Sequence, residues 1–263
     1  MRSRVLLLLP LLIGAGAANA EPLTSCTQTG ICYCVNADFL TVIQEKVSAI
    51  RAKLSAERAA GKATGYISIP ISSLEGSYFK VNLDVATDVK TRVEAKFGVS
   101  SLYMLNPADA QWSLPDQGSA KASGADYMLM WTRVLEGTSG DGADFDFVYF
   151  TGPNDFRAAL KLGDTDIMGR LDTEYDQRAA TDPSLRAIDK KLFRNYYALR
   201  ASVAFSLGSH DEWNIARTVN EKRRSAGRTA IGRQWGIWFD GNPVPPSAYE
   251  TAAANGYAGT CGK

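Results

Sequence analysis

Three short apolar segments, each ending in polar turn residues, constrain the fold of this chain most strongly. They are residues 66–71, 101–105 and 145–150, and a stretch with helical character follows each of them. A short apolar run bounded by turn residues is typical of a buried strand. Strands that alternate with helices favour a parallel sheet covered by helices. We therefore expect a single α/β domain with three layers and a mainly parallel sheet.

Apolar residues recur at helical spacing in several of the remaining segments. The pattern predicts helices over residues 36–60, 77–97 and 125–136, with the first of them following a cysteine-rich loop. Residues 163–207 are predicted to be an insertion with helical pieces. A last helix is expected from Asp211 to Arg224, because Gly208 and Ser209 interrupt the apolar pattern before it.

The N-terminus has the features of a secretory signal peptide. Arg2 and Arg4 precede the apolar run Val5–Ile13, and Ala18-Asn19-Ala20 supplies the small residues of a cleavage site. The run is too short to cross a bilayer, which argues against the alternative of an uncleaved anchor. The sequence predicts a mature chain of residues 21–263 in the periplasm or outside the cell.

Charge and length limit the classes of partner. The chain has 29 Lys and Arg against 28 Asp and Glu, and these charges are interspersed. A nearly neutral chain has no electrostatic case for binding nucleic acid or an anionic membrane. We expect a small-molecule ligand, while the sequence specifies no oligomeric state.

Four cysteines remain after the predicted signal peptide. An even count in an oxidising compartment favours two disulfides. We expect a small loop, Cys26–Cys32, and a clasp, Cys34–Cys261, that joins the two ends of the chain. The alternative is a metal or redox site built on Cys32 and Cys34. With one histidine in the chain, we expect neither a metal nor another cofactor.

Carboxylates are the best candidates for catalysis. The sequence contains no phosphate-binding loop, no nucleophile elbow and no H-E-x-x-H motif. Glu212 lies beside Asp211 and His210 in the first turn of the last predicted helix. A carboxylate there is stabilised by the helix dipole and stays ionised, as a nucleophile requires. The alternative is an acidic residue that stabilises the helix alone.

Polar residues at the ends of the predicted strands are candidates for binding a substrate. The carboxyl ends of parallel strands meet at one edge of a sheet, where α/β folds bind ligands. The alternative for each residue is ordinary turn or capping chemistry. The candidates are Ser68, Glu75, Asn106, Asp109, Asn154 and Asp155.

Three patches resemble the nucleoside 2-deoxyribosyltransferase family and its relatives. They are Y-I-S-I-P-I-S-S from Tyr66, L-N-P-A-D from Leu105, and S-L-G-S-H-D-E-W-N-I-A from Ser206. The resemblance implies a flavodoxin-like fold and cleavage of an N-glycosidic bond, with Glu212 attacking the anomeric carbon of the sugar. Ile69 stands where the family has a glycine.

The sequence thus predicts an exported N-glycosidase or glycosyltransferase that acts on a nucleoside or nucleotide-like substrate. Glu212 would be the nucleophile, Asp211 or His210 its acid–base neighbour, and Glu75 and Asn106 would position the substrate. One alternative is a non-catalytic secreted protein that binds a ligand or partner on the same fold. Ile69 and the long segment after residue 150 favour that alternative. Another is a secreted effector that hydrolyses NAD.

Overall fold

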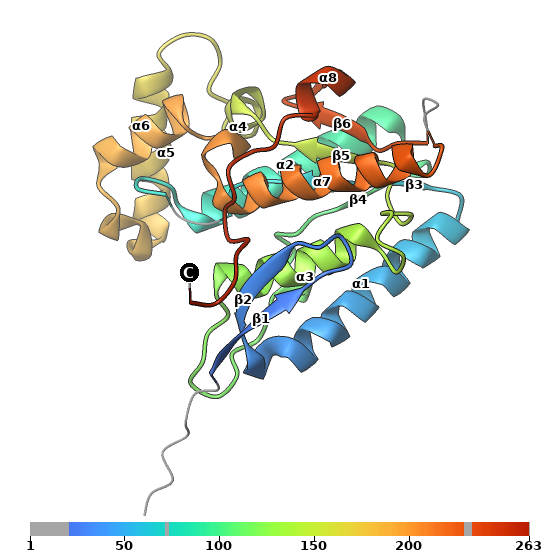
Figure 1. Ribbon diagram of the computed structural model, residues 1–263. Coiled ribbons are helices and arrows are strands. Elements are labelled where there is room, and N and C mark those ends of the chain that lie inside the picture. Colours follow the sequence, from blue (N-terminus) through green and yellow to red (C-terminus); the bar gives the residue numbers. More distant parts are fainter. Residues whose placement is uncertain (1–20, 72–73, 229–232, 263) are drawn as a thin grey trace, which may run out of the picture.

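A computed structural model describes residues 21–71, 74–228 and 233–262 and has a mixed α/β fold (Figure 1). The predicted signal peptide lies outside these residues. The central sheet has the strand order β4-β3-β5-β6-β7. The first four strands are parallel, and β7 is antiparallel to β6. Their bounds are Leu102–Leu105 (β4), Ala63–Ser68 (β3), Phe147–Phe150 (β5), Gly236–Phe239 (β6) and Asn242–Pro243 (β7).

Strand β3 lies in the middle of the sheet and separates two cores. Tyr66 pairs with Leu105 of β4 on one side and with Val148 of β5 on the other. Successive side chains along a strand point to opposite faces. Tyr66 therefore joins one core cluster, and Ile67 joins the other.

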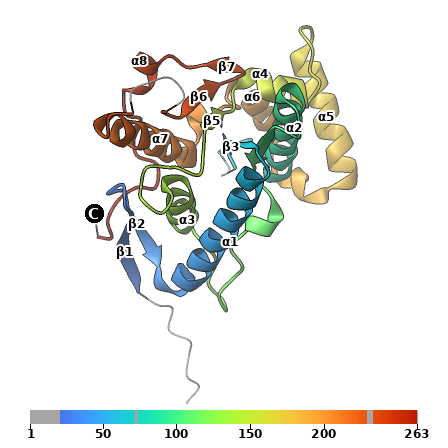
Figure 2. The same ribbon diagram turned by 90° about the vertical axis from the view of Figure 1, so that its right-hand side faces the viewer.

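Helices cover both faces of the sheet, as Figure 2 shows. The face of Tyr66 is covered by α1, α3 and α7, and the face of Ile67 by α2, α4, α5 and α6. The predicted three-layer α/β architecture with a mainly parallel sheet is therefore confirmed. The bounds are Leu40–Ala59 (α1), Phe79–Phe97 (α2), Gly124–Glu136 (α3), Pro153–Ala159 (α4), Ile167–Thr181 (α5), Lys190–Leu199 (α6), Leu207–Ser225 (α7) and Pro246–Tyr249 (α8).

Local sequence explains the helices that were predicted well. The stripe Ile43, Val47, Ile50 and Leu54 on α1 is fully buried, as its spacing requires. Helix α3 begins at a capping box, in which Ser123 and Asp126 satisfy each other's backbone N–H groups. The predicted helical insertion consists of α5, α6 and two 3-10 turns at residues 183–187 and 203–205.

The predicted start of the last helix is wrong by four residues. Helix α7 begins at Leu207, because the hydroxyl of Ser206 accepts a hydrogen bond from the backbone N–H of Ser209 and caps it. Gly208 and Ser209 lie inside its first turn instead of interrupting it. Asp211 and Glu212 therefore lie in the second turn.

Both predicted disulfides are confirmed, and they fix the two ends of the chain. Strands β1 (Pro22–Cys26) and β2 (Cys32–Asn36) form a separate hairpin, in which Cys26 is paired with Cys32 and bonded to it. Cys34 of β2 is bonded to Cys261 near the C-terminus. Among the described residues, no helix is both long and apolar enough to cross a membrane.

We predict that removing the clasp with Cys34→Ser and Cys261→Ser lowers the free energy of unfolding by about 2–5 kcal/mol. The bond spans 227 residues of sequence, and a long closed loop restricts the unfolded chain strongly. Chemical denaturation measures the loss. The matched control, Cys26→Ser with Cys32→Ser, opens a bond that spans 6 residues and is expected to cost less. Equal losses in the two variants would contradict the expectation.

Candidate functional site

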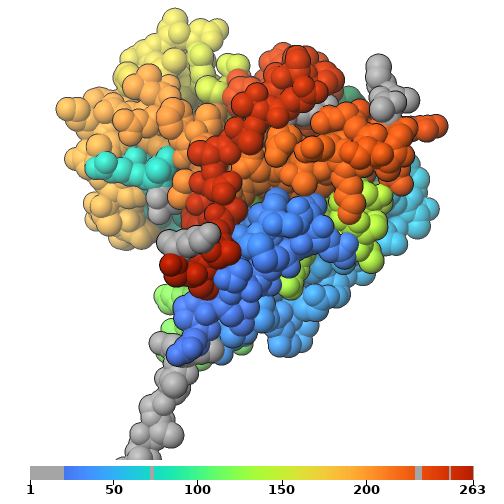
Figure 3. Space-filling model, viewed as in Figure 1, coloured from blue at the N-terminus to red at the C-terminus, as the bar shows by residue number. Residues whose placement is uncertain are grey.

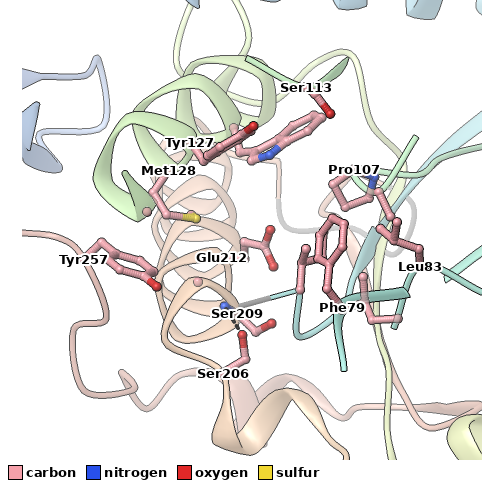
Figure 4. A pocket seen from close by; sticks show the side chains of 16 residues that line it. Phe79, Leu83, Pro107, Ser113, Tyr127, Met128, Ser206, Ser209, Glu212 and Tyr257 are labelled. Atoms are coloured by element: carbon pink, nitrogen blue, oxygen red, sulfur yellow. Dashed lines mark hydrogen bonds between the residues drawn. The ribbon is translucent and has the colours of Figure 1, made fainter. Parts of the chain in front are cut away.

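A cavity of about 390 Å³ lies at the carboxyl edge of β3 and β4. Figure 4 shows its labelled side chains arranged around Glu212. The segments after both strands, the N-terminal parts of α2, α3 and α7, and the C-terminal segment supply its walls. The lining residues are Ile69, Ile71, Phe79, Leu83, Pro107, Ala108, Ser113, Gly124, Tyr127, Met128, Trp131, Ser206, Gly208, Ser209, Glu212 and Tyr257.

The carboxyl group of Glu212 lies inside this cavity and is held by two hydroxyl groups of the central strand. Tyr66 donates a hydrogen bond to one carboxyl oxygen, and Ser68 donates to the other at 2.5 Å. Tyr66 and Ser68 lie on the same face of β3 because they are two residues apart. Glu212 is 6% exposed. Among the lining residues that the structure describes, it is the one carboxylate.

The protonation of Glu212 differs from the prediction. Burial raises the pKa of its carboxyl to about 7, while the hydrogen bonds from Ser68 and Tyr66 lower the pKa and Asp211 raises it further. The predicted helix dipole effect is weak here because Glu212 lies in the second turn of α7. A carboxyl with this pKa is part protonated and part ionised near neutral pH, which suits proton transfer as well as nucleophilic attack.

The walls of the cavity are mainly apolar and aromatic. Phe79 of α2, Tyr127 and Met128 of α3, and Tyr257 of the C-terminal segment face Glu212 in Figure 4. Gly124 permits this arrangement, since a Cβ atom there would lie 2.3 Å from the ring of Tyr257. An apolar cavity with one ionisable group and a few hydroxyl groups is a typical small-molecule site.

Asp211 and His210, the predicted acid–base neighbours of Glu212, make structural contacts. The carboxylate of Asp211 accepts hydrogen bonds from the backbone N–H groups of Gly256, Tyr257 and Ala258 at 2.7–3.0 Å. The ring of His210 contacts the carbonyl oxygen of Ala204 at 3.0 Å. Neither residue lines the cavity. Side chains of successive residues on a helix point in different directions, which separates both from Glu212.

The predicted substrate-binding residues after β3 and β4 are placed apart from Glu212. Glu75 is exposed, and it does not line the cavity. Asn106 is buried, but its side chain completes a turn by accepting from the backbone N–H of Ala108 and donating to Asp109 at 3.4 Å. Pro107 and Ala108, between these two residues, line the cavity, whereas the side chains of Asn106 and Asp109 do not.

The predicted residues after β5 also form local structure. Asp155 is buried and accepts from the hydroxyl of Tyr149 and the backbone N–H of Gly152, which begins α4. Asn154 donates to Asp240 at 2.7 Å. Neither lines the cavity. Of the predicted binding residues, Ser68 is the one that contacts Glu212.

Sequence reasoning missed Tyr66, Ser209 and Tyr257 as parts of the site. Tyr66 is predicted as a strand residue only. Its position two residues before Ser68 places both side chains on one face of the strand, and this spacing could have marked it as part of the site. The hydroxyl of Ser209 lines the cavity, is buried and has no hydrogen-bond partner among the described residues. No local signal marks Tyr257, because Asp211 and the clasp disulfide bring it to the site from the end of the chain.

The described residues contain no group of three or more His, Cys, Asp or Glu side chains that could hold a metal ion. Comparisons with models of known protein families, with curated proteins and with solved structures found no match for this chain. The site must therefore be interpreted from its own geometry.

We predict that Glu212→Gln stabilises the protein relative to the natural chain above pH 7 but not below pH 4. The folded state keeps the proton up to about pH 7, whereas the unfolded state loses it near 4.5. The natural chain therefore loses stability as the pH rises between these values, by about 3 kcal/mol in total. Denaturant titrations of both proteins from pH 4 to pH 8 measure the difference.

The matched control is Glu75→Gln, which changes an exposed glutamate. It removes a carboxyl group outside the cavity, so it should not reproduce the gain in stability that Glu212→Gln shows as the pH rises. If Glu212→Gln shows no more pH dependence than this control, Glu212 ionises normally and the electrostatic description of the site is wrong.

Proposed function

We propose that this chain is an exported N-glycosidase or glycosyltransferase that acts on a nucleoside or nucleotide-like substrate, with Glu212 as the nucleophile. The observation that carries the proposal is the placement of one buried carboxyl, held by Tyr66 and Ser68, in an apolar cavity. Carboxylates attack anomeric carbons in retaining glycosidases. The two disulfides are consistent with export, because such bonds persist in oxidising compartments.

The order of the strands supports the implied flavodoxin-like fold. The flavodoxin-like fold has the strand order 2-1-3-4-5. If β3 is counted as strand 1, the observed order β4-β3-β5-β6-β7 is the same, except that the last strand is antiparallel. In that fold, ligands bind at the carboxyl edge of the sheet, at the switch point between the first and third strands, which correspond to β3 and β5 here. The cavity lies at the same edge beside β3, but on the side of β4.

The proposed reaction uses the carboxyl group of Glu212 and the aromatic side chains that line the cavity. The ionised Glu212 attacks the anomeric carbon, a carbon–oxygen bond forms, and the carbon–nitrogen bond breaks with its electron pair on the base. The aromatic rings of Phe79, Tyr127 and Tyr257 provide flat surfaces for a base. Water or a second base then releases the sugar from Glu212, and the departing base takes its proton from solvent at the mouth of the cavity.

A non-catalytic binding protein is the second candidate, and Ile69 favours it. Its side chain is 4% exposed and forms part of the cavity wall where the resembling family has glycine. A branched side chain at this position prevents the close approach of a sugar to the backbone. In that case the protonated Glu212 would donate a hydrogen bond to a ligand.

We predict that the purified mature chain releases free base from at least one member of a panel of nucleosides, nucleotides and NAD. Glu212→Gln should lower the rate by roughly three orders of magnitude or more, because the nucleophile is lost. Chromatography of the products measures release. Glu75→Gln is the matched control and should keep full activity. If the natural chain turns over nothing but a ligand raises its melting temperature, the binding protein is the better description.

We also predict that the rate of base release rises with pH and levels off above about pH 7. The attacking form is the carboxylate, and the pKa of Glu212 is about 7. Tyr66→Phe removes a hydrogen bond that lowers this pKa, so the midpoint of the pH profile should move to higher pH. Measuring kcat/KM from pH 5 to pH 9 checks both statements. An unchanged midpoint would show that Tyr66 serves packing alone.

A further inference from the structure

A second hollow lies at the opposite, amino edge of the sheet, and arginines line it. Its volume is about 380 Å³, and its lining residues are Arg58, Ala143, Phe145, Asp146, Arg223, Arg228 and Arg233. These residues come from four regions: the end of α1, the loop between α3 and β5, the last turn of α7, and the segment after α7. Figure 1 shows that α1 and α7 both end on this side of the molecule.

Positive charge exceeds negative charge around this hollow. Arg58 pairs with Asp146 at 2.8 Å, and Arg228 pairs with Asp141 at 2.8 Å. The guanidinium of Arg233 makes no hydrogen bond or ion pair with any other residue that the structure describes. Two positive charges are therefore left without a carboxylate partner, those of Arg223 and Arg233.

The buried Arg223 is stabilised by hydrogen bonds to carbonyl oxygens instead of an ion pair with a carboxylate. It is 7% exposed, and its guanidinium donates to the backbone carbonyls of Asp141, Gly142 and Arg233 at 2.6–3.4 Å. Burial lowers its pKa. These contacts fix the floor of the hollow. Carbonyl oxygens carry no net charge, so the guanidinium of Arg223 can still attract an anion at the mouth.

Three guanidinium groups remain accessible above this floor. The side chains of Arg58 and Arg228 are 37% and 47% exposed, and Arg233 is exposed. A guanidinium group presents a rigid fork of donors that matches two oxygens of a phosphate. Three such forks line the hollow, that of Arg58 from the end of α1 and those of Arg228 and Arg233 from the segment after α7.

We propose that this hollow, lined by Arg58, Arg228 and Arg233, binds a diphosphate group of a small molecule. Each phosphate of such a group carries negative charge at neutral pH, which matches the two positive charges without carboxylate partners. The site lies at the amino edge of the sheet, whereas Glu212 lies at the carboxyl edge, so the proposal does not depend on the enzymatic activity.

Isothermal titration of the full mature chain with inorganic pyrophosphate at low ionic strength tests the proposal. We expect saturable binding of one pyrophosphate, weakened about tenfold or more by the double variant Arg228→Gln/Arg233→Gln. Orthophosphate should bind at least about tenfold more weakly, since it can contact fewer of the three forks. Glu212→Gln should bind pyrophosphate as the natural chain does, which separates this site from the cavity of Glu212.

The matched control is Arg200→Gln, which removes an exposed arginine at the end of α6. It should leave pyrophosphate binding unchanged. The proposal is overturned if pyrophosphate does not saturate, if the control weakens binding as much as the double variant does, or if orthophosphate binds equally well. Tighter binding of a short DNA duplex than of pyrophosphate would also overturn it, because the surface would then recognise a polyanion.

Discussion

The contact of Glu212 with Tyr66 and Ser68 is the interaction on which the candidate site depends. It joins helix α7 to the central strand, and it places a carboxyl group beside a cluster of buried apolar side chains. A buried carboxyl is costly unless it is hydrogen-bonded or protonated. Here both occur, since two hydroxyl groups bind it and burial raises its pKa to about 7.

The neighbouring Asp211 has the opposite function on the same turn of α7. Its carboxylate binds three backbone N–H groups of the C-terminal segment, and the clasp disulfide anchors that segment three residues later. Gly256 allows the C-terminal segment to approach α7 closely, because a Cβ atom there would lie 1.8 Å from the carbonyl oxygen of Leu207. Figure 3 shows this segment in red across the face of the molecule. The two adjacent carboxyl groups thus have different roles. Asp211 holds the C-terminal segment that forms one wall of the cavity, and Glu212 lies inside the cavity.

The sequence predicted the elements well where a single periodicity decides the structure. The stripe of α1, the strand at Tyr66 and the capping box of α3 depend on residues close in the chain. The start of α7 was missed because Gly208 and Ser209 resemble a loop, whereas Ser206 caps a helix that includes them. Glu75, Asn106, Asn154 and Asp155 were placed at the right edge. Turn and capping contacts use the side chains of Asn106 and Asp155, Asn154 donates to Asp240, and Glu75 is exposed.

The sequence by itself determined the alternation of strands and helices and the choice of Glu212 as the central carboxyl, and it led to an expected pairing of the cysteines that the structure confirms. These follow from local periodicity, from cysteine spacing and from the shortage of histidine. The tertiary structure alone decided the environment of that carboxyl. The pKa of Glu212, the aromatic wall at Tyr257 and the arginine hollow at the amino edge all depend on residues far apart in the chain. Electrostatic energies depend on the distances between groups in space and on their burial, and local sequence patterns specify neither of these.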